Sequence, residues 1–282
     1  MLIRPAINAS KLVTNFNTYQ YLLDIYPNAA VAYSFRKLSK NYTGNCIRVR
    51  RSSDNTEQDF GFVNNYLDVA GVETFCAGTN GFIVTRYDQS VNANNNTQTT
   101  AAQQVKCVDN GVFYVEDGFN CSYNNRNAKM PIVTGLNLNT NYAVFAVAKP
   151  INSGDVVNLG AGMVFGSMLT LSYYWAGHYS TNQYQTLVRT WTNTYSAPTG
   201  SNYNLSLLFI TNDNTNLEIG NNNNVEITAT DSQTFELSIL ETGFNSSDFY
   251  RFNGYYFEFI AYQNYPNVSG VKTNINNYYG IY

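Results

Sequence analysis

A succession of short apolar segments, each bounded by Asn, Gly or Ser, is the feature that most restricts how this chain can fold. Some of these segments alternate with polar residues, as at 225–230, and others are continuous apolar runs, as at 142–149. Both patterns predict β-strands, half-buried in the first case and buried on both faces in the second. We predict strands at 46–51, 59–63, 81–87, 104–108, 112–115, 142–149, 155–159, 163–174, 184–191, 204–211, 225–230, 234–241 and 255–262.

The composition favours the same architecture. The chain has 24 Tyr and 17 Phe, which are common in strands. Asn makes up roughly 15% of the residues, well above its usual share, and Asn suits turns because it tolerates a positive φ. Many strands and many turns with few long helices are typical of two packed antiparallel sheets.

The charge balance excludes some classes of partner. A net charge of −3 and a pI of about 5.2 argue against a nucleic-acid-binding protein, which needs a basic face. Arg48 and Arg50 share one face of a predicted strand. We interpret this strand as a rim strand with solvated charges, with a clamp for phosphate or carboxylate as the alternative. No apolar run approaches the ~18 residues of a membrane span, so we expect no membrane contact.

Cysteine usage and the N-terminal residues suggest a protein made in a reducing compartment. The first residues contain no apolar core typical of a secretory signal. Cys46, Cys76, Cys107 and Cys121 have no zinc-finger spacing, and His178 is the single histidine. We therefore expect free thiols and no metal or cofactor. Disulfides pairing Cys46 with Cys76 or Cys107 with Cys121 are the alternative.

Two regions depart from the strand pattern. Residues 19–40 have apolar residues at helical spacing, interrupted at Pro27, and predict short N-terminal helical segments. The C-terminal region predicts a closing amphipathic helix, which Ser269 could cap and whose apolar positions are Val271, Ile275, Tyr278 and Tyr279. The Asn run at 221–224 predicts a hairpin. With no repeat and no linker, residues 1–282 are expected to form a single β-sandwich domain.

The stretch YDQSVNANNNTQ at 87–98 carries a family resemblance. It resembles the YDQSGNGN motif of the β-sandwich catalytic domain of microbial α-L-arabinofuranosidases, and 32–55 and 71–90 resemble the segments that precede it. The same three-part block also resembles modules of tailed-phage virion proteins, whose closing strand and helix resemble 254–282. The resemblance implies an all-β fold, a concanavalin A-like jelly-roll sandwich of two antiparallel sheets.

The motif itself has two interpretations. Asp88 and Gln89 could hold a buried loop together by accepting backbone N–H groups, or could contact a ligand or sugar. Val91 and Ala93 stand where the family commonly has glycine, so we expect a loop of different shape.

The resemblance also implies where catalytic carboxyls should lie, and the chain departs from that pattern. A glycosidase needs two carboxyls on opposite sides of the sugar. The mid-chain segment 160–169 contains no Glu, and Asn245 stands near the place of the family's Asp. The remaining late candidates are Glu241, Asp248 and Glu258, of which Glu258 is expected to face outward from a strand. There is no GxSxG elbow for a serine triad. We therefore expect no enzymatic activity.

Two possible ligand sites remain. Tyr174, Trp175 and Trp191 lie in an aromatic-rich region and could stack on sugar rings, with Asp88 and Gln89 as further candidate ligand-binding residues. A calcium site using Asp88, Asp109 and Asp117 is an alternative to having no metal.

The sequence-based hypothesis is therefore a non-enzymatic structural virion protein of a tailed bacteriophage, such as a head decoration or fibre or a tail appendage. It would assemble in the host cytoplasm and contact other virion proteins and copies of itself. The alternatives are a virion lectin module that binds host surface glycans and an arabinofuranosidase-like glycoside hydrolase.

Overall fold

The computed structural model describes the chain from residue 20 onward, with several gaps. The described ranges are 20–125, 128–151, 162–166, 175–178, 185–189, 194–198, 204–230, 236–242, 252–264 and 266–282. For 132–135 and for the strands between 162 and 198 and at 236–242, the backbone alone is described. The predicted strand at 155–159 lies outside these residues.

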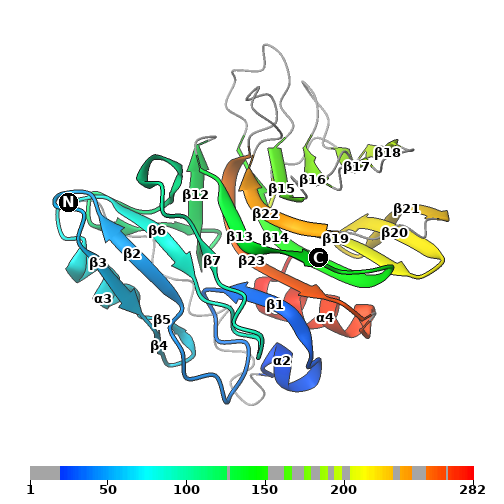
Figure 1. Cartoon of the computed structure of the whole chain (residues 1–282), viewed down its shortest axis with the longest axis horizontal. Coiled ribbons are helices and arrows are strands. Elements are labelled where there is room, and N and C mark those ends of the chain that lie inside the picture. The colour runs from blue at the N-terminus through cyan, green and yellow to red at the C-terminus, as the bar shows by residue number, and fades with distance from the viewer. Residues whose placement is uncertain are drawn as a thin grey trace, which may run out of the picture.

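Most strands belong to one long antiparallel sheet, the main sheet (Figure 1). Ten of its strands form a continuous series in which each strand pairs with the next. Strand β1 (Ala29–Ser34) lies beside the second half of β23, where β12 ends. The series in spatial order is β3 (Glu57–Phe60), β2 (Ile47–Arg51), β6 (Gly81–Arg86), β8 (Val105–Asp109), β12 (Ser122–Asn125), β23 (Asn253–Tyr262), β14 (Asn141–Pro150), β19 (Ser206–Asp213), β20 (Asn216–Asn221) and β21 (Asn224–Thr230).

A second antiparallel sheet covers part of the main sheet. Its order is β7 (Asn96–Thr97), β13 (Met130–Asn137), β22 (Glu236–Thr242), β15 (Gly162–Gly166) and β16 (Trp175–His178). Because β7 also pairs with β6, it joins the two sheets. This is the predicted concanavalin A-like sandwich, and the fold prediction is confirmed.

Short elements complete the structure. The strand β9 (Val112–Phe113) pairs antiparallel with the end of β8, and three two-stranded ribbons share no strand pairing with the two sheets in the described ranges. The helices are α2 (Leu22–Ile25), α3 (Val69–Phe75), a 3₁₀ turn at Ala101–Gln103 and α4 (Val268–Tyr279). The ribbons are β4 (Phe62–Val63) with β5 (Tyr66–Leu67), β10 (Val115–Glu116) with β11 (Phe119–Asn120), and β17 (Gln185–Arg189) with β18 (Thr194–Pro198).

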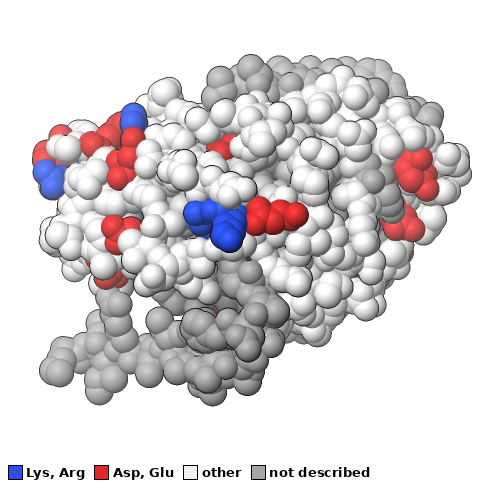
Figure 2. Space-filling view, turned by 90° about the horizontal axis from the view of Figure 1, so that it is seen from below, with Lys and Arg blue, Asp and Glu red and all other residues white. Residues whose placement is uncertain are grey.

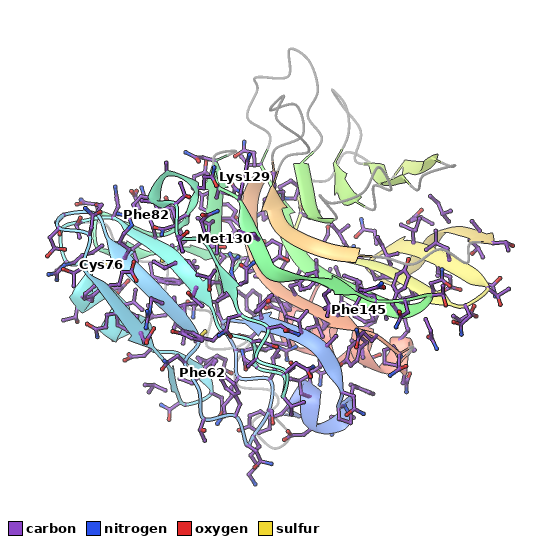
Figure 3. The ribbon with its side chains drawn as sticks, in the orientation of Figure 1. Phe62, Cys76, Phe82, Lys129, Met130 and Phe145 are labelled. Carbon is purple, nitrogen blue, oxygen red and sulfur yellow. The ribbon has the colours of Figure 1, made fainter. Side chains whose placement is uncertain are left out.

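The central strands of the main sheet are buried on both faces. Along β14, Val144 and Ala146 join the core between the two sheets, whereas Phe145 and Val147 join a second core under α2 and α4. Met130 of the second sheet lies in the first core, and Figure 3 labels it together with Phe145. Two buried faces explain why this strand is a continuous apolar run rather than an alternating one.

Asparagine performs the turn role that the composition predicted. Among the described residues, eight of the ten non-glycine residues with positive φ are asparagines. One of them, Asn222, lies in the two-residue connection between β20 and β21, so the predicted hairpin at the Asn run is confirmed. Asparagine forms these turns without a charged side chain. This agrees with the face in Figure 2, which carries only scattered charged groups.

Two sequence-based expectations about the segments at 29–34 and 47–51 are wrong. The segment after Pro27, expected to be helical, forms β1, whose six residues are all buried. Its small apolar residues fit a doubly covered strand as well as a helix, and tertiary pairing with β23 decides between them. The second error concerns β2, which is an inner strand between β3 and β6 and not a rim strand. Arg50 is buried, with its Nε donating to Gln104, whereas Arg48 is 41% exposed, as a solvated charge was expected to be, and pairs with Asp59.

The predicted C-terminal helix is confirmed as α4. Val271, Ile275 and Tyr279 are buried against the main sheet. The N-cap is Asn267, whose side chain accepts the N–H of Gly270, and not Ser269 as expected. None of the helices in the described ranges is long and apolar enough to span a membrane.

A buried ion pair attaches this helix to the sandwich. The guanidinium of Arg36 binds both carboxylate oxygens of Glu258, with Nε–Oε2 at 2.8 Å and Nη2–Oε1 at 2.9 Å. The hydroxyls of Ser34 and Tyr279 also donate to Oε2, and the guanidinium lies 4.5 Å from the ring centre of Tyr278. Glu258 is only 1% exposed, so the expectation that it faces solvent is wrong: α4 covers it.

The Arg36–Glu258 pair gives the first testable prediction. Glu258→Ala is expected to lower the free energy of unfolding by about 3–5 kcal/mol, because it leaves a buried guanidinium without its counter-charge. Urea denaturation of the variant and the parent protein measures this difference. Glu226→Ala on the exposed strand β21 is the matched control and should change stability by no more than about 0.5 kcal/mol. Equal stability of the two variants would contradict the assigned role.

Candidate functional site

The motif at 87–98 leaves the end of β6 and crosses to β7, beside the free edge of β1. Asp88 is 3% exposed, and its carboxylate accepts four hydrogen bonds from the chain. Its Oδ1 accepts the backbone N–H groups of Ala32 and Ser90, both at 2.8 Å. Its Oδ2 accepts the backbone N–H of Asn94 at 2.8 Å and the hydroxyl of Ser90 at 2.6 Å. The carboxylate therefore holds both ends of its own loop and the middle of β1.

Gln89 continues this contact along the same edge. Its backbone N–H donates to the carbonyl of Ala32, and its side-chain amide donates to the carbonyls of Ser34 and Arg36. Its Oε1 accepts the N–H of Leu38 at 2.8 Å. The side chain is 3% exposed and replaces the backbone groups that a neighbouring strand would otherwise supply.

The asparagines that follow complete the pattern. Asn92 and Asn94 donate from their side chains to the carbonyl of Ala30, and Asn95 accepts the N–H of Asp88. Asn96 donates to the carbonyl of Met130 in the second sheet. The loop therefore follows β6 and binds β1 and β13 through side-chain amides.

Ala93 has a backbone conformation that residues other than glycine rarely adopt. It has a φ of +53°, a left-handed conformation that glycine adopts without strain. The neighbouring Val91 is 92% exposed and carries no such constraint. Alanine thus adopts at position 93 a conformation that favours glycine, and the expected difference in loop shape from the family stays a prediction.

The electrostatics of the motif follow from its burial. Desolvation raises the pKa of Asp88, and the hydrogen bonds from Ser90, Ala32 and Asn94 oppose this shift. Burial also raises the pKa of Tyr33, whose hydroxyl donates to the carbonyl of Asn94. A carboxylate whose acceptor sites are all occupied by N–H and O–H groups of the protein is suited to holding a fold and has no spare lone pair directed at solvent.

Arg86 lies just before the motif and inside the sandwich. It is 4% exposed, donates to the hydroxyl of Ser122 at 2.8 Å and lies 5.3 Å from the ring centre of Tyr256. Arg86 and Tyr256, together with Tyr33 and Cys46, line a small cavity with room for about one water molecule. This cavity is too small for a sugar.

The candidate ligand-binding aromatics are not brought together by any described contact. Tyr174 and Trp191 lie outside the described residues, and Trp175 is the first residue of β16, of which the backbone alone is described. A direct sugar contact of these three residues, and of Asp88 and Gln89, stays a prediction. The contacts of Asp88 and Gln89 support the structural interpretation of those two.

No described contact brings the other acidic candidates together. Glu241 belongs to β22, Asp248 lies outside the described residues, and Glu258 is held by Arg36. Asp109 binds Lys106 and Asp117 binds Lys149, each in its own surface ion pair. In the described part of the chain no group of three or more His, Cys, Asp or Glu could hold a metal, and the four cysteines are buried and free.

Comparison with known proteins identifies what this arrangement resembles. The sequence model for the catalytic domain of α-L-arabinofuranosidase B matches residues 23–145, which contain the whole motif and β1. The fold is that of the arabinofuranosidases. A mutant GH54 α-L-arabinofuranosidase soaked with 4-nitrophenyl α-L-arabinofuranoside has a TM-score of 0.68 at 15% identity, covering 90% of this chain and 64% of that one.

Two further structures support the same comparison. A GH54 α-L-arabinofuranosidase soaked with a cyclic sulfate inhibitor has a TM-score of 0.68 at 14% identity. An arabinofuranosidase complexed with arabinofuranosyl-α-1,2-xylobiose has a TM-score of 0.62 at 16% identity. Both matches cover 90% of this chain, which spans 64% of the length of each matched protein. No curated protein sequence matches the chain.

These matches correct the functional hypothesis drawn from the sequence. The expectation of a non-enzymatic structural protein of a phage particle is wrong, because the matched domain is catalytic and the three structures are glycoside hydrolases. The apparent loss of carboxyls at 160–169 and at Asn245 lies in the part of the chain that the domain match does not reach.

The motif is visible in the sequence, but the strand edge that it binds is not. Residues 30–39 have apolar residues at helical spacing, and this pattern predicted a helix in place of β1 and its edge. The pairing of Arg36 with Glu258 joins residues 222 positions apart, and no local pattern in the sequence signals it.

The role of Asp88 can be tested by substitution. Asp88→Asn is expected to lower the free energy of unfolding by about 1–3 kcal/mol, because the amide nitrogen cannot accept the buried N–H of Asn94. Chemical denaturation measures the change. The control is Asp54→Asn, which weakens a solvent-exposed pair with Arg51 and should have a much smaller effect on stability. Unchanged stability of Asp88→Asn would show that its contacts do not hold the loop.

Proposed function

We propose that the chain is an arabinofuranosidase-like glycoside hydrolase domain. The observation that carries the proposal is the match of residues 23–145 to a catalytic-domain model, supported by a shared fold over 90% of the chain. The matched segment contains the motif, the strand it holds and the first strands of both sheets. Family likeness and fold therefore point to one activity.

In this proposal the motif at 87–98 has a structural role and takes no part in bond cleavage. Hydrolysis of a glycosidic bond needs one carboxyl as acid and another as nucleophile or base. Asp88 and Glu258 are each bound by several donors of the protein, so neither serves as a reacting group. We assign the reacting carboxyls to residues outside this scaffold, with Glu241 and Asp248 as the first candidates.

The position of Glu241 is consistent with this assignment. It lies in β22, an inner strand of the second sheet between β13 and β15. Phe165 of β15 pairs with Leu240 in the middle of the paired part of β15 and β22, and Glu241 is the next residue along β22. Tyr174, Trp175 and Trp191 follow β15 in the chain and would supply stacking surfaces for the sugar.

The proposed activity is tested with 4-nitrophenyl α-L-arabinofuranoside. The purified chain is expected to release 4-nitrophenol, measured by its absorbance. Glu241→Gln and Asp248→Asn should each lower kcat by about 10²-fold or more, because each removes a proton-transferring or nucleophilic carboxyl. Glu226→Gln on the exposed strand β21 is the control and should retain the parent rate.

The outcomes separate the two parts of the proposal. Folded protein that releases no nitrophenol from this substrate would contradict the hydrolase assignment. Activity that survives both substitutions would keep the hydrolase and reject these two residues.

A further inference from the structure

A row of side chains crosses the main sheet on its outer face, away from the second sheet. Tyr123 of β12 lies directly opposite Tyr255 of β23, and their ring centres are 5.4 Å apart. On β8, which pairs with β12, Lys106 lies opposite Tyr123. On β14, which pairs with β23, Lys149 lies opposite Tyr255. Directly paired residues share one face of a sheet, so the order Lys–Tyr–Tyr–Lys runs across four neighbouring strands.

The burial of neighbouring residues confirms which face this is. Val105 and Cys107 flank Lys106 and belong to the core between the sheets, so Lys106 points the other way. Tyr255 packs against the second core, on the side of the main sheet that α4 covers. The row therefore lies beside α4 and on the opposite face from the second sheet.

A third tyrosine completes an aromatic platform. The ring of Tyr114 lies 5.5 Å from that of Tyr123 and 6.3 Å from that of Tyr255. All three tyrosines are half-buried. Their hydroxyls make no hydrogen bond with any residue in the described ranges, and remain available to a ligand.

Each end of the row carries an ion pair. Lys106 binds Asp109 at 2.5 Å, and Lys149 binds Glu116 and also Asp117, the latter at 3.1 Å. The lysines are therefore neutralised within the protein, and the platform presents paired donors and acceptors rather than a net positive charge. Such a surface does not attract acidic chains, whereas it matches a neutral ligand rich in hydroxyl groups.

We propose that these three tyrosines with the two flanking ion pairs form a second carbohydrate-binding surface, separate from the catalytic site, for neutral polysaccharide chains. Tyrosine rings offer apolar faces for the C–H face of sugar rings, and the phenolic, ammonium and carboxylate groups bind sugar hydroxyls. Such a surface would hold a polymer substrate beside the domain. The proposal rests on the proposed function for its choice of ligand class.

The test is affinity electrophoresis of the full chain in gels that contain arabinan, a neutral polymer, or polygalacturonate, an acidic one. Arabinan is expected to retard the parent protein. The double substitution Tyr123→Ala and Tyr255→Ala should weaken this binding about tenfold or more, because it removes two of the three aromatic faces on which sugar rings would stack. Tyr282→Ala, at an exposed tyrosine outside the platform, is the matched control and should leave retardation unchanged.

A second variant covers the case in which the double substitution unfolds the protein. Tyr114 lies between β9 and β10, and its backbone bonds to Cys107 and Cys121 do not need the side chain. Tyr114→Ala should therefore fold, as circular dichroism can verify, and should bind arabinan several-fold more weakly.

The failure of this proposal is distinguishable from failure of the proposed function. Hydrolysis of 4-nitrophenyl α-L-arabinofuranoside reports on the catalytic site and should be the same in the tyrosine variants and the parent protein. Retardation that persists in the folded variants, or is stronger in polygalacturonate than in arabinan, would overturn the binding surface even if hydrolysis is found. Retardation that depends on the tyrosines would support the surface even if no hydrolysis occurs.

Discussion

The free edge of β1 is the constraint on which the motif and its surroundings depend. One side of this strand pairs with β23, and within the described ranges no strand pairs with its other side. Backbone groups on a buried edge must find partners, because an unpaired N–H or C=O away from water costs about 1–3 kcal/mol. Asp88 and Gln89 provide those partners from their side chains. A carboxylate and an amide thus take the place of a strand.

This arrangement explains why the motif predicts fold more directly than activity. Its acidic residue accepts hydrogen bonds from its own loop and from β1, and its amides bind β1 and β13. Under the hydrolase function that we propose, the candidate reacting groups Glu241 and Asp248 belong to the second sheet and to the segment that follows it in the chain.

The sequence predicted the apolar strands of the main sheet, but not the groups of residues that meet across its strands. The strands 142–149, 204–211 and 255–262 were predicted because two covered faces produce long apolar runs. The Lys–Tyr–Tyr–Lys row could not be predicted, because its members come from four strands and meet through register alone. The same holds for Arg36 and Glu258, which α4 covers together.

The sequence by itself determined the all-β class, most strands of the main sheet, the hairpin at the Asn run and the C-terminal helix. These features follow from local periodicity and turn chemistry, which act over a few residues. Only the tertiary structure decided that 29–34 is a strand, that β2 is internal and that Asp88 is a structural acceptor. Each of these depends on which strand lies alongside, and strand pairing joins segments that are distant in the chain, so no short window of sequence contains it.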